Sequence, residues 1–453
     1  MDVKNKKVVI LGAARSGVSA ALLLKNLGSD LFVSDIANKK QKQQEIKILE
    51  KLGIPFEFGQ HSNKIYDADF VVLSPGISIA IPKIQSILKK GIPIYSEVEV
   101  ASWFCKSPII AITGSNGKTT TTTLLGKMLQ SEMPEAIIAG NIGSPLSGQV
   151  LNSNKRFWAS VEISSFQLET IDRFHPKVVV ILNLAPNHLD WYSTFEDYVN
   201  AKLRIVKNLD PQDYLIYNND DPLLVEKVKT QQAKKLCFSL KDHESDAYTK
   251  NEAIFLNNNK LIDISQVMLK GQHNQMNIMA AALAAKCANI SEPSIIKILS
   301  SFTSVEHRLE HVQAINNISF INDSKATTLE SLSVALQSFD TPIILIAGGK
   351  DKGSDYSRVN SLLKKKVRAV ILIGSAQDKM ASAWQDITDI TRAISLEEAV
   401  HKAFSMAHRG DVVLLSPACS SFDMFQDFED RGRKFKQIVN KIASEYEDNQ
   451  AKK

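Results

Sequence analysis

The sequence is poor in cysteine and has no long hydrophobic run. Its 453 residues include four cysteines and no C-x-x-C pair, so a disulfide framework or a cysteine zinc site is not expected and a reducing compartment is indicated. No apolar stretch approaches the about 20 residues of a membrane-spanning helix. The first apolar run is short and ends in a glycine loop, unlike a secretory signal peptide. We therefore expect a cytoplasmic protein with no membrane partner.

An excess of charge of one sign is also missing. The net charge is only +5 and the charged residues are dispersed along the chain. Such a balance does not favour nucleic acid as a partner, but it suits a nucleotide or another anionic small molecule.

Short β-branched runs alternate with helix-length amphipathic segments throughout the chain, a pattern typical of parallel α/β domains. The predicted strands are Lys7–Leu11, Asp30–Val33, Phe70–Leu73, Ile109–Thr113, Trp158–Ile163, Val178–Leu182, Ile343–Ala347, Ala369–Ile373 and Val412–Leu415. An alanine-rich helix is predicted over Met276–Ala288. A new glycine loop after the first strand series, and the end of the alanine-rich helix, predict three domains at residues 1–97, 98–303 and 304–453.

The strongest motif is a phosphate loop. The apolar strand Ile109–Thr113 runs into Gly114-Ser115-Asn116-Gly117-Lys118-Thr119 and then a helix that contains Thr120. Glycines let backbone N–H groups face phosphates, and a helix N-terminus adds positive potential. Lys118 is then expected on the β- and γ-phosphates and the Thr119 hydroxyl on Mg²⁺. Ile112 stands where the usual pattern has its first glycine. The alternative is an ordinary strand–helix turn.

Three further residues of this region are candidates for a functional role. Glu162 ends an apolar strand, where it could hold a metal ion or simply lie at the surface. His188 follows the strand Val178–Leu182 and could be a metal ligand or a loop histidine. Lys202 falls on the apolar stripe of a helix for which Ser193 and Glu196 predict a capping box. A lysine there can extend its amine to solvent, or be a buried group whose charge is tuned or modified.

The first and last thirds contain weaker signals. Gly12 to Gly17 opens a βαβ unit that ends at Asp35 and resembles a dinucleotide fingerprint. Ala14 replaces its middle glycine, which argues against a nicotinamide cofactor but not against another nucleotide. Polar clusters at 322–327, 348–353 and 416–423 follow apolar strands and suggest a ligand-binding rim, although each could be a normal loop.

Taken in order, these motifs resemble the Mur ligase family over essentially the whole chain. The segments that carry the resemblance are 113–119, 162–169, the His188 loop, 201–204, 273–274, 307–308, 322–327 and 416–419. The resemblance implies three α/β domains: a Rossmann-like UDP-binding domain, a central phosphate-loop ATPase domain with a mostly parallel sheet, and a Rossmann-like domain for the amino acid. It is closest to the branch that adds D-glutamate to UDP-N-acetylmuramoyl-L-alanine.

The resemblance also implies roles for individual residues. Lys118, His188, Lys202 and Arg308 are expected to be catalytic. ATP contacts are expected from Gly114, Ser115, Asn116, Gly117, Lys118, Thr119, Thr120, Asn274, Arg308, Asp323 and Lys325. Contacts with the UDP substrate are expected from Ser16, Asp35, Asn141 and Ser164, and contacts with D-glutamate from Thr327, Lys352, Ser421 and Phe428. Mg²⁺ ligands are expected to be Thr119, Glu162, His188 and Lys202, the last as a carbamate formed with CO₂.

The implied reaction is a peptidoglycan-forming amide ligation by a monomer that uses ATP and two Mg²⁺ ions, with an acyl-phosphate intermediate and domain closure. A related ligase with a different amino acid, such as one of the folate polyglutamylating type, remains the nearest alternative. Other classes are a phosphate-loop kinase or regulatory NTPase, a dinucleotide-dependent dehydrogenase and a non-catalytic nucleotide-binding module.

Overall fold

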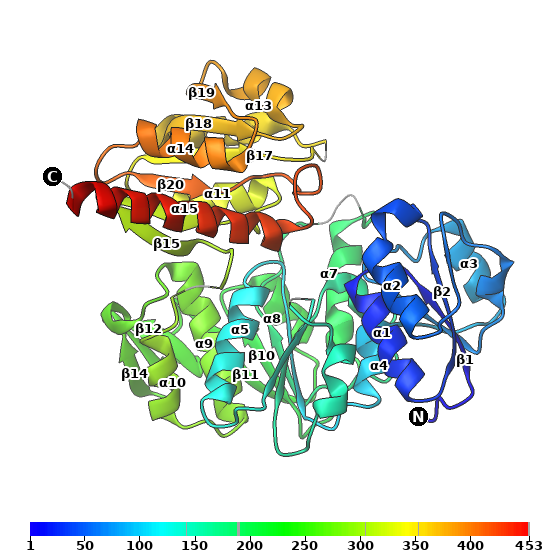
Figure 1. Cartoon of the computed structure of the whole chain (residues 1–453). Coiled ribbons are helices and arrows are strands. Elements are labelled where there is room, and N and C mark those ends of the chain that lie inside the picture. Colours follow the sequence, from blue (N-terminus) through cyan, green and yellow to red (C-terminus); the bar gives the residue numbers. More distant parts are fainter. Residues whose placement is uncertain (142, 188–190, 304, 352, 452–453) are drawn as a thin grey trace. The chain divides into compact units, whose positions relative to one another are not determined.

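The computed structural model describes residues 1–141, 143–187, 191–303, 305–351 and 353–451. The chain divides into two compact units, Met1–Phe302 and Thr303–Lys453. The first unit contains two sheets and the second contains one (Figure 1). Within the described residues, no helix combines the length and the apolar character needed to cross a membrane.

The amino-terminal sheet has five parallel strands in the order β3-β2-β1-β4-β5. The strands are β1 Lys7–Leu11, β2 Asp30–Asp35, β3 Phe56–Phe58, β4 Phe70–Leu73 and β5 Ile94–Ser96, and the helices are α1 Arg15–Asn26, α2 Gln43–Lys51, α3 Pro82–Lys89 and α4 Glu97–Ser102. The strand order reverses between β1 and β4. Open α/β sheets bind ligands beside such a reversal, at the carboxyl ends of the strands.

The central sheet has nine strands in the order β14-β13-β12-β11-β10-β9-β6-β8-β7. The pairings of β12 with β13 and of β13 with β14, at one edge of this sheet, are antiparallel, and the others are parallel. The strands are β6 Ile109–Thr113, β7 Ile137–Gly140, β8 Ala159–Glu162, β9 Val178–Ile181, β10 Tyr214–Asn218, β11 Lys234–Ser239, β12 Ala247–Lys250, β13 Ala253–Leu256 and β14 Asn259–Asp263. The helices are α5 Lys118–Gln130, α6 Ser165–Leu168, α7 Phe195–Leu203, α8 Pro222–Val228, α9 Gln272–Cys287 and α10 Glu292–Leu299.

Both faces of the central sheet are covered, which explains its continuous apolar strands. Alternate residues of β6 enter different cores: Ile110 and Ile112 belong to the core that also contains residues of α5 and α9. Ala111 points to the opposite core, which contains residues of α4 and α7. Helices α5 and α9 lie side by side on the sheet (Figure 1). The carboxyl end of β6 is thereby fixed beneath the start of α5.

The second unit contains a six-stranded sheet in the order β15-β16-β20-β17-β18-β19, in which only β15 is antiparallel to its neighbour. The strands are β15 Glu310–Ile315, β16 Ile318–Asn322, β17 Ile343–Gly348, β18 Val367–Ile373, β19 Asp389–Arg392 and β20 Val412–Leu415. The helices are α11 Leu329–Gln337, α12 Asn360–Lys366, α13 Gln377–Trp384, α14 Leu396–Met406 and α15 Phe428–Ala451.

The structure confirms the expected fold class and all nine predicted strands, whose ends shift by at most two residues. The alanine-rich helix starts earlier than predicted, at Gln272. The predicted capping box of Ser193 and Glu196 is wrong by one residue. Thr194 Oγ1 accepts the Asp197 N–H at 3.1 Å and Asp197 accepts the Thr194 N–H at 3.0 Å, because two overlapping hydroxyl–acid pairs fit the motif and the helix begins at Phe195.

Glu99 of α4 anchors the turn that leads into β9. Its side chain is completely buried, and its carboxylate accepts the backbone N–H groups of Asp172, Arg173 and Phe174 at 2.8 to 2.9 Å. The same carboxylate accepts the indole N–H of Trp103 at 2.7 Å. A residue between the first two sheets therefore fixes where β9 starts.

We expect Glu99→Ala to lower the free energy of unfolding by about 3 kcal/mol or more, since it leaves three backbone N–H groups without their buried acceptor. Urea denaturation of the full chain measures the effect. Glu50→Ala, at an exposed position of α2, is the matched control and should change the midpoint little. Equal midpoints for the two variants would contradict this role of Glu99.

Candidate active site

The phosphate loop joins β6 to α5. Gly117 is the residue before the helix, has a φ of +83°, and lies so close to Asn277 that a Cβ would collide with the Asn277 amide oxygen. Only glycine fits these two conditions. The loop therefore brings backbone N–H groups to the start of a 13-residue helix, where the helix dipole favours an anion.

Lys118 folds back over this loop. Its Nζ donates to the carbonyl oxygens of Gly114 and Ser115 at 2.8 and 3.0 Å. The ammonium group is thus held beside the backbone that would surround a phosphate. A helix N-terminus and a lysine at one place make a site for a phosphate-bearing ligand.

The loop after β9 is bonded to the phosphate loop. The Ser115 hydroxyl donates to the Ala185 carbonyl at 2.9 Å and accepts the Ala185 N–H at 2.8 Å. Asn183 accepts the N–H of Asn116 at 2.9 Å. His188, predicted as a catalytic residue and metal ligand, lies just beyond this loop and outside the described residues.

Glu162 ends β8 and is 2% exposed. One carboxylate oxygen accepts from the Asn141 side chain at 3.0 Å. The other, Oε2, is buried and has no hydrogen-bond partner among the described residues. Buried polar atoms normally have a partner, so this oxygen fits a role as ligand of a cation.

Lys202 of α7 is 1% exposed, which confirms that it lies on the buried face of its helix. Its Nζ donates to the Gly114 carbonyl at 2.9 Å, the carbonyl to which Lys118 also donates. The same Nζ lies 4.7 Å from the centre of the Tyr198 ring, whose hydroxyl donates to Ser115 at 3.0 Å. The interpretation in which the amine extends to solvent is therefore excluded.

Burial is the main cause that places the pKa of Lys202 well below its ordinary value. The nearby charge of Lys118 lowers it further, while Glu162 raises it in part. A neutral amine is a nucleophile, whereas an ammonium group is not. Burial therefore shifts this amine toward its neutral, nucleophilic form close to the phosphate loop.

A chain of side chains connects α5 to α9. Thr121 donates to the Asn277 amide oxygen at 3.3 Å, and Asn277 donates to Asn274 at 3.1 Å. Asn274, a predicted ATP contact, is thus linked to the phosphate-loop helix. The roles of Asn277 and of the Tyr198 hydroxyl are not predicted from the sequence. The available signal for Asn277 was a polar residue one turn after Asn274 on an otherwise apolar helix face.

The residues predicted to contact the UDP substrate all lie in the first unit. Asp35 accepts the N–H groups of Ala13 and Ala37 at 2.6 and 2.7 Å, so it closes the glycine loop after β1. Ser16 is partly exposed at the start of α1. Ser164 caps α6 and bonds Gln167 at 3.0 Å, and Asn141 bonds Glu162.

Of the predicted site residues in the second unit, Arg308, Asp323 and Lys325 gather near the end of β16. Asp323 is buried and accepts the Ser416 hydroxyl at 2.8 Å and the Leu309 N–H at 3.2 Å. Burial raises the pKa of Asp323 to about 7, against the opposing effects of the Ser416 hydrogen bond and Arg308. Lys325 Nζ lies 5.7 Å from the centre of the Phe428 ring.

Of the predicted D-glutamate contacts in the same unit, Thr327 and Ser421 lie in loops, and Phe428 is the first residue of α15. Thr327 is partly buried and Ser421 is buried. Their loops are adjacent, because the Ala418 N–H donates to the Ala326 carbonyl at 2.9 Å. Lys352 lies outside the described residues.

A cavity of about 550 Å³ lies away from the phosphate loop, at the amino ends of β6 and β9, and Trp103, Lys106 and Lys177 are among its lining residues. Parallel α/β sheets bind their substrates at the opposite, carboxyl ends. The neighbouring His175, Asp210 and Asp213 could hold a metal ion by their spacing. Lys177 already pairs with Asp213 at 3.0 Å, however, so this cluster is explained as ion pairing.

Three parts of the chain match three domains of one family. Residues 6–96 match the N-terminal domain of MurD-like Mur ligases, residues 112–285 the Mur ligase middle domain, and residues 307–419 the glutamate ligase domain of Mur ligases. The UDP-N-acetylmuramoylalanine–D-glutamate ligase of Chloroherpeton thalassium is 44% identical over 97% of this chain and 98% of its own length. An enzyme with the same name from Koribacter versatilis is 41% identical over 98% and 99%.

Solved structures of other Mur ligases share the fold. UDP-N-acetylmuramate-alanine ligase from Thermotoga maritima superposes with a TM-score of 0.63 at 20% identity, covering 96% of this chain and 99% of that one. MurF from Acinetobacter baumannii gives a TM-score of 0.60 at 14% identity, covering 95% and 93%. At these low sequence identities, the similarity shows that the fold is shared and nothing further.

The lowered pKa of Lys202 predicts a specific pH dependence of stability. Between that pKa and about 10.4, the ordinary value of a lysine, the unfolded chain binds a proton that the folded chain does not, so this residue makes stability rise with pH. Lys202→Met removes the effect. We expect the variant to unfold at a higher temperature than the wild type near neutral pH, by a margin that shrinks as the pH rises.

Thermal unfolding of both proteins in CO₂-free buffers at a series of pH values measures this margin. Lys229→Met, at an exposed lysine of the same unit, is the control and should show no pH-dependent margin. A margin for Lys202→Met that stays constant with pH would mean that the amine is charged in the folded protein.

Proposed function

The chain belongs to the Mur ligase family, and we propose that it is the ligase that adds D-glutamate to UDP-N-acetylmuramoyl-L-alanine. ATP is converted to ADP and phosphate, and the product is a precursor of peptidoglycan. The observation that carries the proposal is the name shared by relatives of 41 to 44% identity that span nearly the whole chain. The phosphate loop with its buried carboxylate and lysine supports the chemistry.

The phosphate-loop residues are proposed to bind ATP. Backbone N–H groups from Gly114 to Thr120 and the ammonium group of Lys118 suit the charge of the phosphates. Asn274 of the first unit, and Arg308, Asp323 and Lys325 of the second, are proposed as further nucleotide contacts. Lys118 and Arg308 supply the positive charge that phosphoryl transfer requires.

The residues present fit Mg²⁺. Glu162 Oε2, which has no hydrogen-bond partner in the described parts of the chain, and the hydroxyl of Thr119 are hard oxygen ligands, which Mg²⁺ prefers. His188 and a carbamylated Lys202 complete the proposed set, which would hold two ions. Bound Mg²⁺ would neutralise phosphate charge and orient the substrate carboxylate.

The burial of Lys202 supports the proposed carbamate. In its neutral form, Nζ would bond to the carbon of CO₂ while one C=O π bond opens onto oxygen, and the proton released from the nitrogen would pass to water. The product is an anion in place of a potential cation. This change suits a buried position next to Lys118, where a second positive charge is unfavourable.

The reaction is proposed to proceed through an acyl phosphate. A carboxylate repels an attacking amine, so the γ-phosphoryl group of ATP is first transferred to the substrate carboxylate. The amine of D-glutamate then attacks the acyl carbon, and the tetrahedral intermediate expels phosphate. Lys118 and Arg308 stabilise the charge of both steps electrostatically.

The other substrates are assigned to the remaining predicted residues. Ser16, Asp35, Asn141 and Ser164 are proposed to contact the UDP substrate, within domains 1–97 and 98–303. Thr327, Lys352, Ser421 and Phe428 are proposed to contact D-glutamate, within domain 304–453. The four free cysteines are consistent with a cytoplasmic location, and we propose a monomer that acts there.

The test is phosphate release from ATP and Mg²⁺ with UDP-N-acetylmuramoyl-L-alanine and one of D-glutamate, L-glutamate, L-lysine, diaminopimelate or no amino acid. Release should require the sugar nucleotide and D-glutamate together, and should stop when Mg²⁺ is chelated. Lys118→Ala should reduce it by at least about 100-fold, because the charge on the transferred phosphate loses its partner.

Lys127→Ala, at an exposed position nine residues further along α5, is the matched control and should retain activity. Preference for another amino acid would support a related ligase instead. Release without any amino acid would favour a phosphate-loop NTPase, and either result would remove the D-glutamate assignment.

A further inference from the structure

Arg308 lies in a segment of the second unit with an uncommon backbone. Its two neighbours, His307 and Leu309, have φ values of 64° and 44°. Non-glycine residues rarely adopt this left-handed conformation, which costs free energy and persists only where the surroundings enforce it. The backbone on both sides of Arg308 is therefore held in place by something other than local preference.

Three hydrogen bonds fix this backbone. The His307 N–H donates to Glu310 Oε2 at 2.9 Å, and the His307 carbonyl accepts the Lys325 N–H at 3.0 Å. The Leu309 N–H donates to Asp323 Oδ1 at 3.2 Å. The segment that carries Arg308 is thus bonded to the loop after β16, which contains two further proposed nucleotide contacts.

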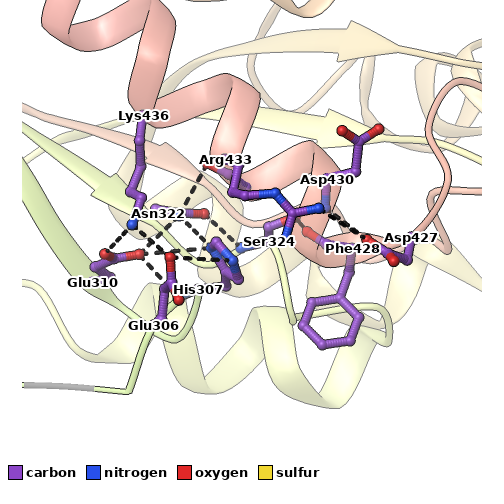
Figure 2. A network of polar contacts seen from close by, with 11 residues as sticks. Glu306, His307, Glu310, Asn322, Ser324, Asp427, Phe428, Asp430, Arg433 and Lys436 are labelled. Carbon is purple, nitrogen blue, oxygen red and sulfur yellow. Dashed lines mark hydrogen bonds and ion pairs between the residues drawn. The ribbon is translucent and has the colours of Figure 1, made fainter. Parts of the chain in front are cut away.

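The His307 side chain adds a second set of contacts. His307 is 3% exposed, and its Nδ1 accepts a hydrogen bond from the Asn322 amide at 2.9 Å. The same amide donates to Glu310 Oε2 at 2.9 Å, so His307, Asn322 and Glu310 form one cluster (Figure 2). Burial lowers the pKa of His307, although the charges of Glu306 and Glu310 act in the opposite direction. The lower pKa raises the share of the neutral ring, whose Nδ1 can accept this hydrogen bond.

Helix α15 closes the cluster from the other side. Gly432 lies against the imidazole, and a Cβ at this position would collide with Nδ1. One turn further along, Lys436 donates to Glu306 at 2.7 Å and to Glu310 at 2.9 Å (Figure 2). The ring thus lies between the Asn322 amide, the two glutamates and the backbone of α15.

We propose that His307 is a positioning residue, which holds Arg308 in the orientation that binds the nucleotide by packing against Gly432 and accepting the Asn322 hydrogen bond. The proposal rests on the role of Arg308 in the proposed function. The motif His307-Arg308 then consists of one residue that contacts ligand and one that orients it.

A double-mutant cycle tests the proposal on the full chain. Affinity for ADP with Mg²⁺ is measured by calorimetry for the wild type, His307→Ala, Arg308→Ala and the double variant. If His307 acts through Arg308, each single variant should weaken binding by about tenfold, and the double variant should bind no more weakly than Arg308→Ala. Losses that multiply in the double variant would overturn the proposal, as would wild-type affinity of His307→Ala.

Two variants separate positioning from loss of folding. Asparagine adopts left-handed φ readily, and its amide oxygen can accept the Asn322 hydrogen bond, so His307→Asn should restore most of the affinity. Gly432→Ala leaves the ring chemistry intact but displaces the ring, and it should weaken ADP binding as His307→Ala does. If His307→Asn binds as weakly as His307→Ala, or Gly432→Ala binds as the wild type does, the proposal is wrong.

His311→Ala removes an exposed histidine of β15 and should leave ADP affinity unchanged. ADP binding is measured without the ligation reaction. The binding cycle would therefore still test the role of His307 if the D-glutamate assignment failed. An Arg308→Ala variant with wild-type affinity would instead remove the assignment of Arg308 and overturn the proposal with it.

Discussion

The carbonyl oxygen of Gly114 accepts hydrogen bonds from two lysines, Lys118 and Lys202, and the candidate site depends on this convergence. Two ammonium groups at one buried oxygen would repel each other, and Lys202 has no access to water. The arrangement is stable when Lys202 is neutral or has become an anion. Glu162 opposes this requirement in part, because its charge raises the pKa of Lys202. Its Oε2 has no hydrogen-bond partner among the described residues, which fits a cation at this carboxylate.

The sequence was sufficient to predict much of the fold. Strands such as Val178–Ile181 are buried on both faces, so they read as continuous apolar runs with polar turns after them. The phosphate loop was predictable because glycine and lysine at a strand–helix junction satisfy local requirements of backbone and charge. Helix ends were less certain: the capping box was placed at Ser193 rather than Thr194, because neighbouring residues offer the same hydroxyl and acid at the same spacing.

Contacts between distant segments were not predictable from a single sequence. Glu99 accepts three backbone N–H groups more than 70 residues away, yet in sequence it is one of two acids in the short segment Glu97–Ser102. Asn277 meets Gly117 and Thr121 only because α9 packs on α5. The motif His307-Arg308 was recognised by resemblance, whereas the roles of Asn322 and Gly432 beside it depend on how α15 packs in the second unit.

The proposed metal site requires the buried Lys202 amine to react with CO₂ and become an anion. The most direct measurement is a ¹³C NMR spectrum of the full chain after incubation with ¹³C-labelled bicarbonate. We expect a carbamate carbon resonance in the wild type that is absent from Lys202→Met and present in Lys229→Met. A wild-type spectrum without this resonance, or a resonance that persists in Lys202→Met, would contradict the proposed carbamate.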